Sequence, residues 1–216
     1  MKKLVLLIGP TLMIFIGLTI YGNVPLTFGL FYGWLLLVPV YFSLTNQNHS
    51  EWKIRITRNS VLLGTASGLA FLLIIFASVS FLFSSIIELE IIGLLLEEWN
   101  FNGKMVWGLI AVLIILNPYL EENYWRNFIF EELKVSMSPA MAIITSSFFY
   151  SFYHILSMVE LFNWPFNVLA VIPVFIAGLV WGLFKHKSGS LAAPVVSHIL
   201  ADTGIMMIYL VYIHSW

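Results

Sequence analysis

The chain has 216 residues, a length typical of one domain, and 60% of them are hydrophobic while only 10% are charged. Soluble domains carry about 25% charged residues, so the composition indicates a protein whose solvent is the lipid bilayer. The net charge of −1 argues against a nucleic-acid partner, because phosphate binding requires a basic excess, and the lack of cysteine excludes disulfides, thiolate metal ligands and a cysteine nucleophile.

Seven apolar stretches approach the roughly 20 residues that a membrane-spanning helix requires. They are Leu4–Tyr21, Phe28–Leu44, Ser60–Phe83, Met105–Leu120, Ser138–Leu156, Phe166–Phe184 and Leu191–Ile213. The first follows a basic start, as a signal peptide does, but it exceeds the usual apolar core of about 7–15 residues and no A-x-A-like site follows it. We therefore expect it to remain as a first transmembrane helix of an all-α, polytopic helix bundle with about seven or eight helices.

The charges between these stretches predict an orientation. Basic residues gather in the loops of one side, at Lys2, Lys3, Lys53, Arg55, Arg58, Lys134, Lys185 and Lys187. The loops of the other side carry Glu88, Glu90, Glu97, Glu98 and Glu160, with Lys104 as the lone cation. The positive-inside rule then predicts a cytoplasmic N-terminus and an external C-terminus. Interfacial anchors are expected near the span ends at Tyr21, Trp52, Trp99, Trp107, Trp164 and Trp216.

Two connecting segments carry predictions of their own. The segment Ser84–Lys104 mixes apolar residues with four glutamates, which favours an interfacial helix on the membrane surface. The segment Tyr119–Lys134 continues the fourth span without a helix breaker, so it is expected to extend that helix toward the cytoplasm. The pair Asn117-Pro118 predicts a kink.

A charged side chain inside a membrane span costs several kcal/mol, so it faces a bundle interior or water and is a functional candidate by default. Six ionisable side chains lie within or at the end of spans four, five and seven. They are Glu121, Glu122, Arg126, His154, His198 and Asp202.

Residues four apart share a helical face, so Glu122 and Arg126 are expected to pair. Glu121 is rotated by about 100° from its neighbour, which leaves it free to act as a general base. The alternative is a helix end at the membrane interface whose charges snorkel toward water and carry no chemistry.

The two histidines allow similar pairs of interpretations. His154 lies four residues after Tyr150 and is either functional or a hydrogen-bonded core histidine. His198 and Asp202 also share a face, so the carboxylate can orient the imidazole, or both can face a substrate or metal. The alternative is a private hydrogen bond that holds helices together.

In order and spacing these residues resemble the CAAX-processing and bacteriocin-processing (CPBP, or Abi) family of intramembrane proteases, with E-E-x-x-x-R, F-x-x-x-H and H-x-x-x-[ND] on successive helices. The first motif is intact at positions 121–126. The second ends at His154 and has Tyr150 in place of phenylalanine, and the third runs from His198 to Asp202. The resemblance covers about Leu120 to Gly204, whereas the first three spans show no motif.

The resemblance implies that Glu121 and His154 activate an attacking water, and that His198 and Asp202 stabilise the oxyanion of the tetrahedral intermediate. The second glutamate and the arginine of the first motif would support the site. An ionised Asp202 would repel an oxyanion, so this residue must be protonated, orient the imidazole or bind a metal.

The resemblance leaves two mechanisms open. Glu121, His154 and His198 form a His₂Glu set, a known catalytic zinc pattern with an open fourth position, so zinc is one alternative. A metal-independent glutamate mechanism is the other. Either one requires water within the membrane, so the helices are expected to surround a polar intramembrane cavity.

The predicted function is therefore an intramembrane endopeptidase similar to CAAX prenyl proteases, which acts within membrane lipid on a protein or peptide substrate, with a lipidated one as an option. The alternative is a non-catalytic bacteriocin immunity factor, scaffold or small transporter, because intramembrane Glu, His and Asp also form proton relays and binding sites. We expect one integral membrane domain over residues 1–216, with N-terminal spans in 1–104 and a catalytic core in 105–216.

Overall fold

The computed structural model describes residues 2–45 and 55–214, so the expected anchors Trp52 and Trp216 and the cation Lys53 lie outside the described residues. Within the described ranges every regular element is helical. Seven helices there are long and apolar enough to cross a membrane, over Lys3–Ile20, Val24–Thr45, Arg58–Phe83, Met105–Lys134, Pro139–Leu161, Phe166–Ser188 and Ala192–Ile213. The predicted all-α bundle is confirmed, and the seven spans indicate a multi-pass membrane protein.

Short irregular turns divide several spans into consecutive elements. In chain order these are α1 (Lys2–Ile14), η1 (Phe15–Ile20), α2 (Val24–Thr45), α3 (Arg58–Ile86), α4 (Leu89–Glu98), α5 (Met105–Ala111), η2 (Val112–Leu116), α6 (Asn117–Glu122), η3 (Asn123–Ile129), α7 (Phe130–Lys134), α8 (Pro139–Phe152), α9 (His154–Leu161), α10 (Phe166–Leu169), α11 (Val171–Ser188), α12 (Ala192–Ile208) and η4 (Tyr209–Ile213), where η marks π-helical turns. Together with α4 the described spans make a bundle of eight helices, within the predicted number.

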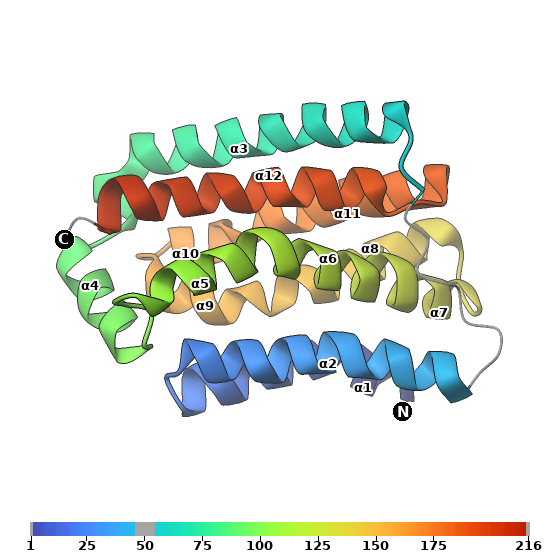
Figure 1. The fold of residues 1–216 in the computed structure, drawn as a ribbon, viewed down its shortest axis with the longest axis horizontal. Helices are drawn as coiled ribbons and strands as arrows, with labels where there is room; N and C mark the ends of the chain where they lie inside the picture. The colour runs from blue at the N-terminus through green and yellow to red at the C-terminus, as the bar shows by residue number, and fades with distance from the viewer. Residues whose placement is uncertain (1, 46–54, 215–216) are drawn as a thin grey trace.

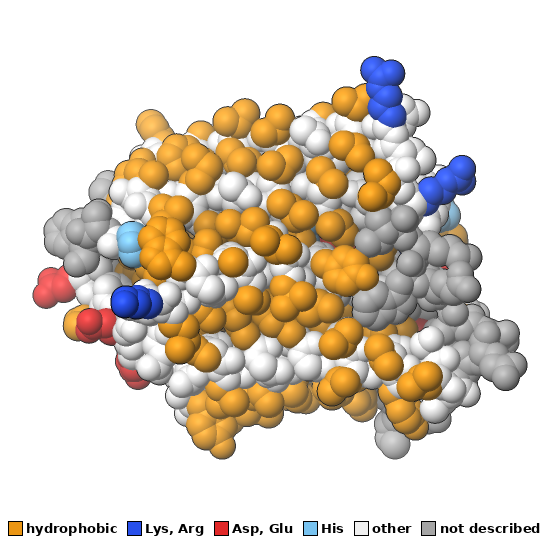
Figure 2. Space-filling view, in the orientation of Figure 1, with side chains coloured by type: hydrophobic (Ala, Val, Ile, Leu, Met, Phe, Trp, Pro, Cys, Tyr) orange, Lys and Arg blue, Asp and Glu red, His pale blue; other side chains and the backbone are white. Residues whose placement is uncertain are grey.

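The helices lie alongside one another in the long direction of the molecule (Figure 1). The helices α3 and α12 pack together at one edge, whereas α1 and α2 pack together at the opposite edge. The run from α5 to α7 passes between these two pairs. Hydrophobic side chains cover the middle of one face and charged side chains lie at its two ends (Figure 2), as expected for a surface in contact with lipid.

The helix of span four extends over 30 residues from Met105 to Lys134, which confirms the predicted extension. Two π-helical turns, η2 and η3, interrupt it. The first directly precedes Asn117-Pro118, where proline cannot donate the backbone hydrogen bond that a regular helix requires. All seven residues of η3 are buried. Since π-bulges often occur at functional sites, η3 is a candidate location for the site of this protein.

Glycines bring α3 and α12 into close contact. A Cβ atom added to Gly68 would lie 2.8 Å from the Cβ of Leu200 and 2.9 Å from the Cα of Ser197, and one added to Gly64 would lie 2.8 Å from the carbonyl oxygen of Ala193. Small residues that allow this approach are typical of helix pairs in membranes, where close van der Waals packing drives association. The contact fixes α3 against the helix that carries His198 and Asp202.

The acidic segment between spans three and four contains the helix α4, so a helix is present where one was predicted. Figure 1 shows α4 at one end of the bundle. That this helix lies along the membrane surface stays a prediction.

Candidate active site

The first polar cluster comes from the point where α6 passes into η3. The Nε atom of Arg126 lies 3.2 Å from Oε2 of Glu122, and both side chains are at most 1% exposed. The predicted pair is present. Because both side chains are buried, they do not extend into water as the alternative interpretation required. The guanidinium also lies over the ring of Tyr150, 4.2 Å from its centroid, a cation–π geometry.

The second carboxylate oxygen of Glu122 joins this cluster to α12. Oε1 accepts a hydrogen bond of 3.0 Å from Nδ1 of His198, across 76 positions of the chain. The helix of span four and the last helix thus meet through charged groups in the interior. Since this bond takes Nδ1, the chemistry available to the imidazole is centred on its other nitrogen.

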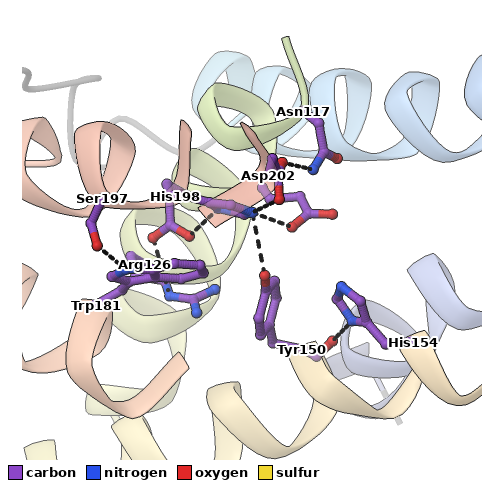
Figure 3. Close-up of polar contacts among 10 residues, drawn as sticks. Asn117, Arg126, Tyr150, His154, Trp181, Ser197, His198 and Asp202 are labelled. Atoms are coloured by element: carbon purple, nitrogen blue, oxygen red, sulfur yellow. Dashed lines mark hydrogen bonds and ion pairs between the residues drawn. The ribbon is translucent and has the colours of Figure 1, made fainter. Parts of the chain in front are cut away.

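Three oxygens converge on Nε2 of His198 (Figure 3). Asp202 Oδ1 lies at 3.4 Å, the Tyr150 hydroxyl at 3.5 Å and Glu121 Oε2 at 3.7 Å. The predicted pair of His198 and Asp202 is therefore present. We call the group formed by Glu121, Glu122, Arg126, His198 and Asp202 the polar centre.

Asp202 has a second partner that the sequence analysis missed. The side-chain amide of Asn117 donates a hydrogen bond of 3.1 Å to Oδ2 of Asp202. Asn117 lies four residues before Glu121 and shares its helical face, so the spacing could have identified it. The sequence-based prediction for Asn117 concerned the kink alone.

A layer of indole and hydroxyl groups supports the imidazole. The ring of Trp181 on α11 stacks on His198, with centroids 4.2 Å apart and planes 18° apart. Its Nε1 donates a hydrogen bond of 2.9 Å to the hydroxyl of Ser197, which also accepts one of 3.0 Å from Ser67 on α3. No local spacing links these three helices, so the sequence offered no signal for this layer.

His154 occupies a different position. It begins α9 after a break at Tyr153, and its Nδ1 lies 3.0 Å from the carbonyl oxygen of Tyr150. A carbonyl can only accept, so Nδ1 carries a hydrogen, and in the neutral imidazole Nε2 then keeps a lone pair. The ring stacks on Tyr153, with centroids 4.4 Å apart. Among the described residues, no hydrogen bond or ion pair joins His154 to the polar centre.

The predicted metal ligands are not assembled. Within residues 2–45 and 55–214, no group of three or more His, Cys, Asp or Glu side chains is placed to hold a metal ion. Glu121 and His198 are close to each other, but His154 turns to a backbone carbonyl instead. The residues as placed do not fit a bound zinc ion, and the roles given below belong to side chains alone.

Buried carboxylates and an imidazole in contact can exchange protons with a reacting group, and the guanidinium beside them supplies a fixed positive charge. The structure thus defines a multi-pass membrane protein with a buried cluster of ionisable side chains inside its helix bundle. Residues 102–204 match the family described as Type II CAAX prenyl endopeptidase Rce1-like, and the chain therefore carries a domain of this family. The predicted resemblance is confirmed. No curated protein and no solved structure matches the chain.

Proposed function

We propose that the protein is an intramembrane endopeptidase of the CAAX type, which hydrolyses a peptide bond with Glu121 as the general base. The observation that carries the proposal is the approach of Glu121 to His198, at 3.7 Å in a buried centre within the matched family segment. A carboxylate and an imidazole in contact can act as the general base and general acid of a hydrolysis by water.

In the proposed reaction, Glu121 accepts a proton from water while the water oxygen bonds to the carbonyl carbon of the substrate. The carbonyl π electrons move to oxygen and form an oxyanion next to His198. As the intermediate collapses, the C–N bond breaks and the proton passes to the leaving nitrogen. His154, with its Nε2 lone pair, is assigned to orient the water.

Glu122 and Arg126 act on His198 as positioning residues. Glu122 holds Nδ1 of the imidazole at 3.0 Å, and Arg126 binds the other oxygen of the same carboxylate. This chain of contacts fixes the ring plane, as a buried carboxylate bonded to Nδ1 does for the imidazole of a catalytic triad. Asp202 holds the opposite nitrogen.

Access to the centre requires the helices to part. Glu121 and His198 are each about 3% exposed at their side chains, whereas Asp202 reaches 14%. Substrate and water are therefore proposed to arrive from the Asp202 side, into the predicted polar cavity. The family description favours a C-terminal peptide that carries a prenyl group. The core of 105–216 would hold the chemistry, with residues 1–104 as supporting spans.

The positive-inside rule supports a cytoplasmic N-terminus for this enzyme. The first residues of α1 and α3 and the last residues of α7 and α11 lie at one end of the bundle (Figure 1). Lysines or arginines occur at each of these four helix ends, whereas α4, with its glutamates, lies at the other end.

The test is cleavage of a fluorogenic prenylated CAAX peptide by the purified protein in detergent, with Glu121→Gln beside the wild type. The variant is expected to lose turnover while remaining folded. Glu131→Gln is the matched control, because Glu131 lies on the same long helix, pairs with Lys134 at 2.8 Å and is one-third exposed. Equal cleavage by Glu121→Gln and the wild type would contradict the proposal and favour a non-catalytic role, such as immunity factor, scaffold or transporter.

A further inference from the structure

Tyr150 brings a hydroxyl to the polar centre at a position where the family motif has phenylalanine. The residue is 2% exposed, and its hydroxyl lies 3.5 Å from Nε2 of His198. The guanidinium of Arg126 fixes the ring from above at 4.2 Å. The phenol therefore faces the nitrogen next to which the oxyanion would form.

Asp202 faces the same nitrogen at 3.4 Å. A carboxylate within a few ångströms of a developing oxyanion repels it, and the low dielectric of a buried site strengthens the repulsion. Both oxygens of Asp202 are already engaged, one with His198 and the other with the amide of Asn117. Asp202 thus orients its neighbours, and the oxyanion requires a donor from another residue.

Three tyrosines lie near the polar centre, and their phenol groups have different neighbours. The Tyr153 hydroxyl faces Glu121, although without a hydrogen bond of standard geometry. The Tyr32 phenol, on α2, is close enough to the carboxylates of Glu121 and Asp202 to interact with them electrostatically. Tyr150 is the phenol whose hydroxyl contacts His198. Its 3.5 Å contact is long for a hydrogen bond, so the hydroxyl is weakly engaged and can turn to a substrate oxygen.

We propose that Tyr150 is a catalytic residue whose phenol donates a hydrogen bond to the oxyanion, in place of the neutral side-chain donor that position 202 lacks. The inference rests on the proposed function. The phenol keeps its proton throughout, so the step adds no proton transfer to the hydrolysis. Positions 150 and 202 are coupled, because a neutral amide at 202 would make the phenol redundant.

The test is a double-mutant cycle with Tyr150→Phe, Asp202→Asn and their combination, assayed with the prenylated peptide. Tyr150→Phe keeps the ring and removes only the hydroxyl. In the wild-type background it is expected to lower kcat by about 10²-fold, the loss typical of one oxyanion donor, with KM little changed. In the Asp202→Asn background the same change is expected to lower kcat by less than about 10-fold, because the amide then donates.

Tyr124→Phe is the matched control, since it removes another buried phenol hydroxyl. That hydroxyl accepts a bond from Trp34 and donates one to the carbonyl of Leu6, away from the polar centre, so kcat is expected to be unchanged. Three results would overturn the inference. Tyr150→Phe could have the kcat of the wild type, or it could change KM and leave kcat the same. It could also lower kcat by the same factor in the wild-type and Asp202→Asn backgrounds. Where Asp202→Asn itself has no measurable turnover, the kcat of Tyr150→Phe alone decides.

Glu121→Gln, measured in parallel, distinguishes a failure of the proposed role of Tyr150 from a failure of the proposed protease function. An inactive Glu121→Gln with a fully active Tyr150→Phe overturns the role of Tyr150 and leaves the protease intact. An active Glu121→Gln, or a wild type that cleaves no prenylated or unmodified CAAX peptide, overturns the proposed function and the role of Tyr150 with it.

Discussion

Replacement of Arg126 by methionine tests whether the buried ion pair holds the molecule together. Methionine retains the length and apolar character of the arginine stem but removes the charge that faces Glu122. The carboxylate of Glu122 has no exposed surface, so it would remain buried with only His198 as a partner. The same substitution also removes the cation over the ring of Tyr150.

The expected loss in the free energy of unfolding is large because the Arg126–Glu122 pair is buried, not because its two atoms are especially close. Removing one partner of a buried ion pair typically costs about 3–5 kcal/mol, since it leaves an uncompensated charge. The pair of Lys134 and Glu131, whose side chains are about one-third exposed, is shorter, at 2.8 Å against 3.2 Å. Exposed pairs contribute about 1 kcal/mol or less, so Lys134→Met on the same long helix is the control.

The assay is reversible unfolding in mixed micelles as the fraction of denaturing detergent rises, with helical circular dichroism and tryptophan fluorescence as independent probes. Arg126→Met should unfold at a clearly lower denaturant fraction than the wild type, and Lys134→Met close to it. The double variant Arg126→Met, Glu122→Gln should recover part of the loss, because it removes the orphaned charge. Equal unfolding of the two single variants would refute the argument.

Two further predictions concern the contacts of α12. Ser197→Ala leaves the buried Nε1 of Trp181 without its 2.9 Å acceptor, so we expect a loss of about 1–3 kcal/mol in the same unfolding assay; an unchanged midpoint would argue against this bond. Gly68→Val should separate α3 from α12, where an added Cβ already meets Leu200. Cross-linking between single cysteines placed in the two helices measures this, and Gly29→Val, where an added Cβ meets nothing within 4 Å, should leave cross-linking unchanged.

Much of the fold could be predicted because lipid leaves the backbone few choices. A segment within the hydrocarbon must satisfy its own hydrogen bonds, so a long apolar stretch becomes a helix. The seven spans followed from this rule, and the extension of span four to Lys134 followed from the absence of a helix breaker after Tyr119. The π-helical turns did not, because span length and hydropathy carry no information about the backbone hydrogen-bond pattern within a helix.

In the site too, contacts within one helix could be predicted from the sequence, whereas contacts between helices could not. The pairs Glu122–Arg126 and His198–Asp202 lie four residues apart on one helix, so periodicity alone predicted them. The bond between Glu122 and His198 crosses helices, and no spacing within one helix indicates it. His154 was expected at the centre from the resemblance, whereas its contact with the backbone carbonyl of Tyr150 depends on the helix break before it.

The contact of Ser67 with Ser197 has a consequence for how this protein can be taken apart. Ser67 lies in α3, outside residues 102–204, yet its hydroxyl reaches the residue next to His198. The region recognisable by similarity is thus smaller than the unit that must be kept whole. A chimera that joins this core to foreign N-terminal helices would need small residues at the positions of Gly64 and Gly68, and a version without residues 1–101 would expose to lipid the face of α12 that packs on α3.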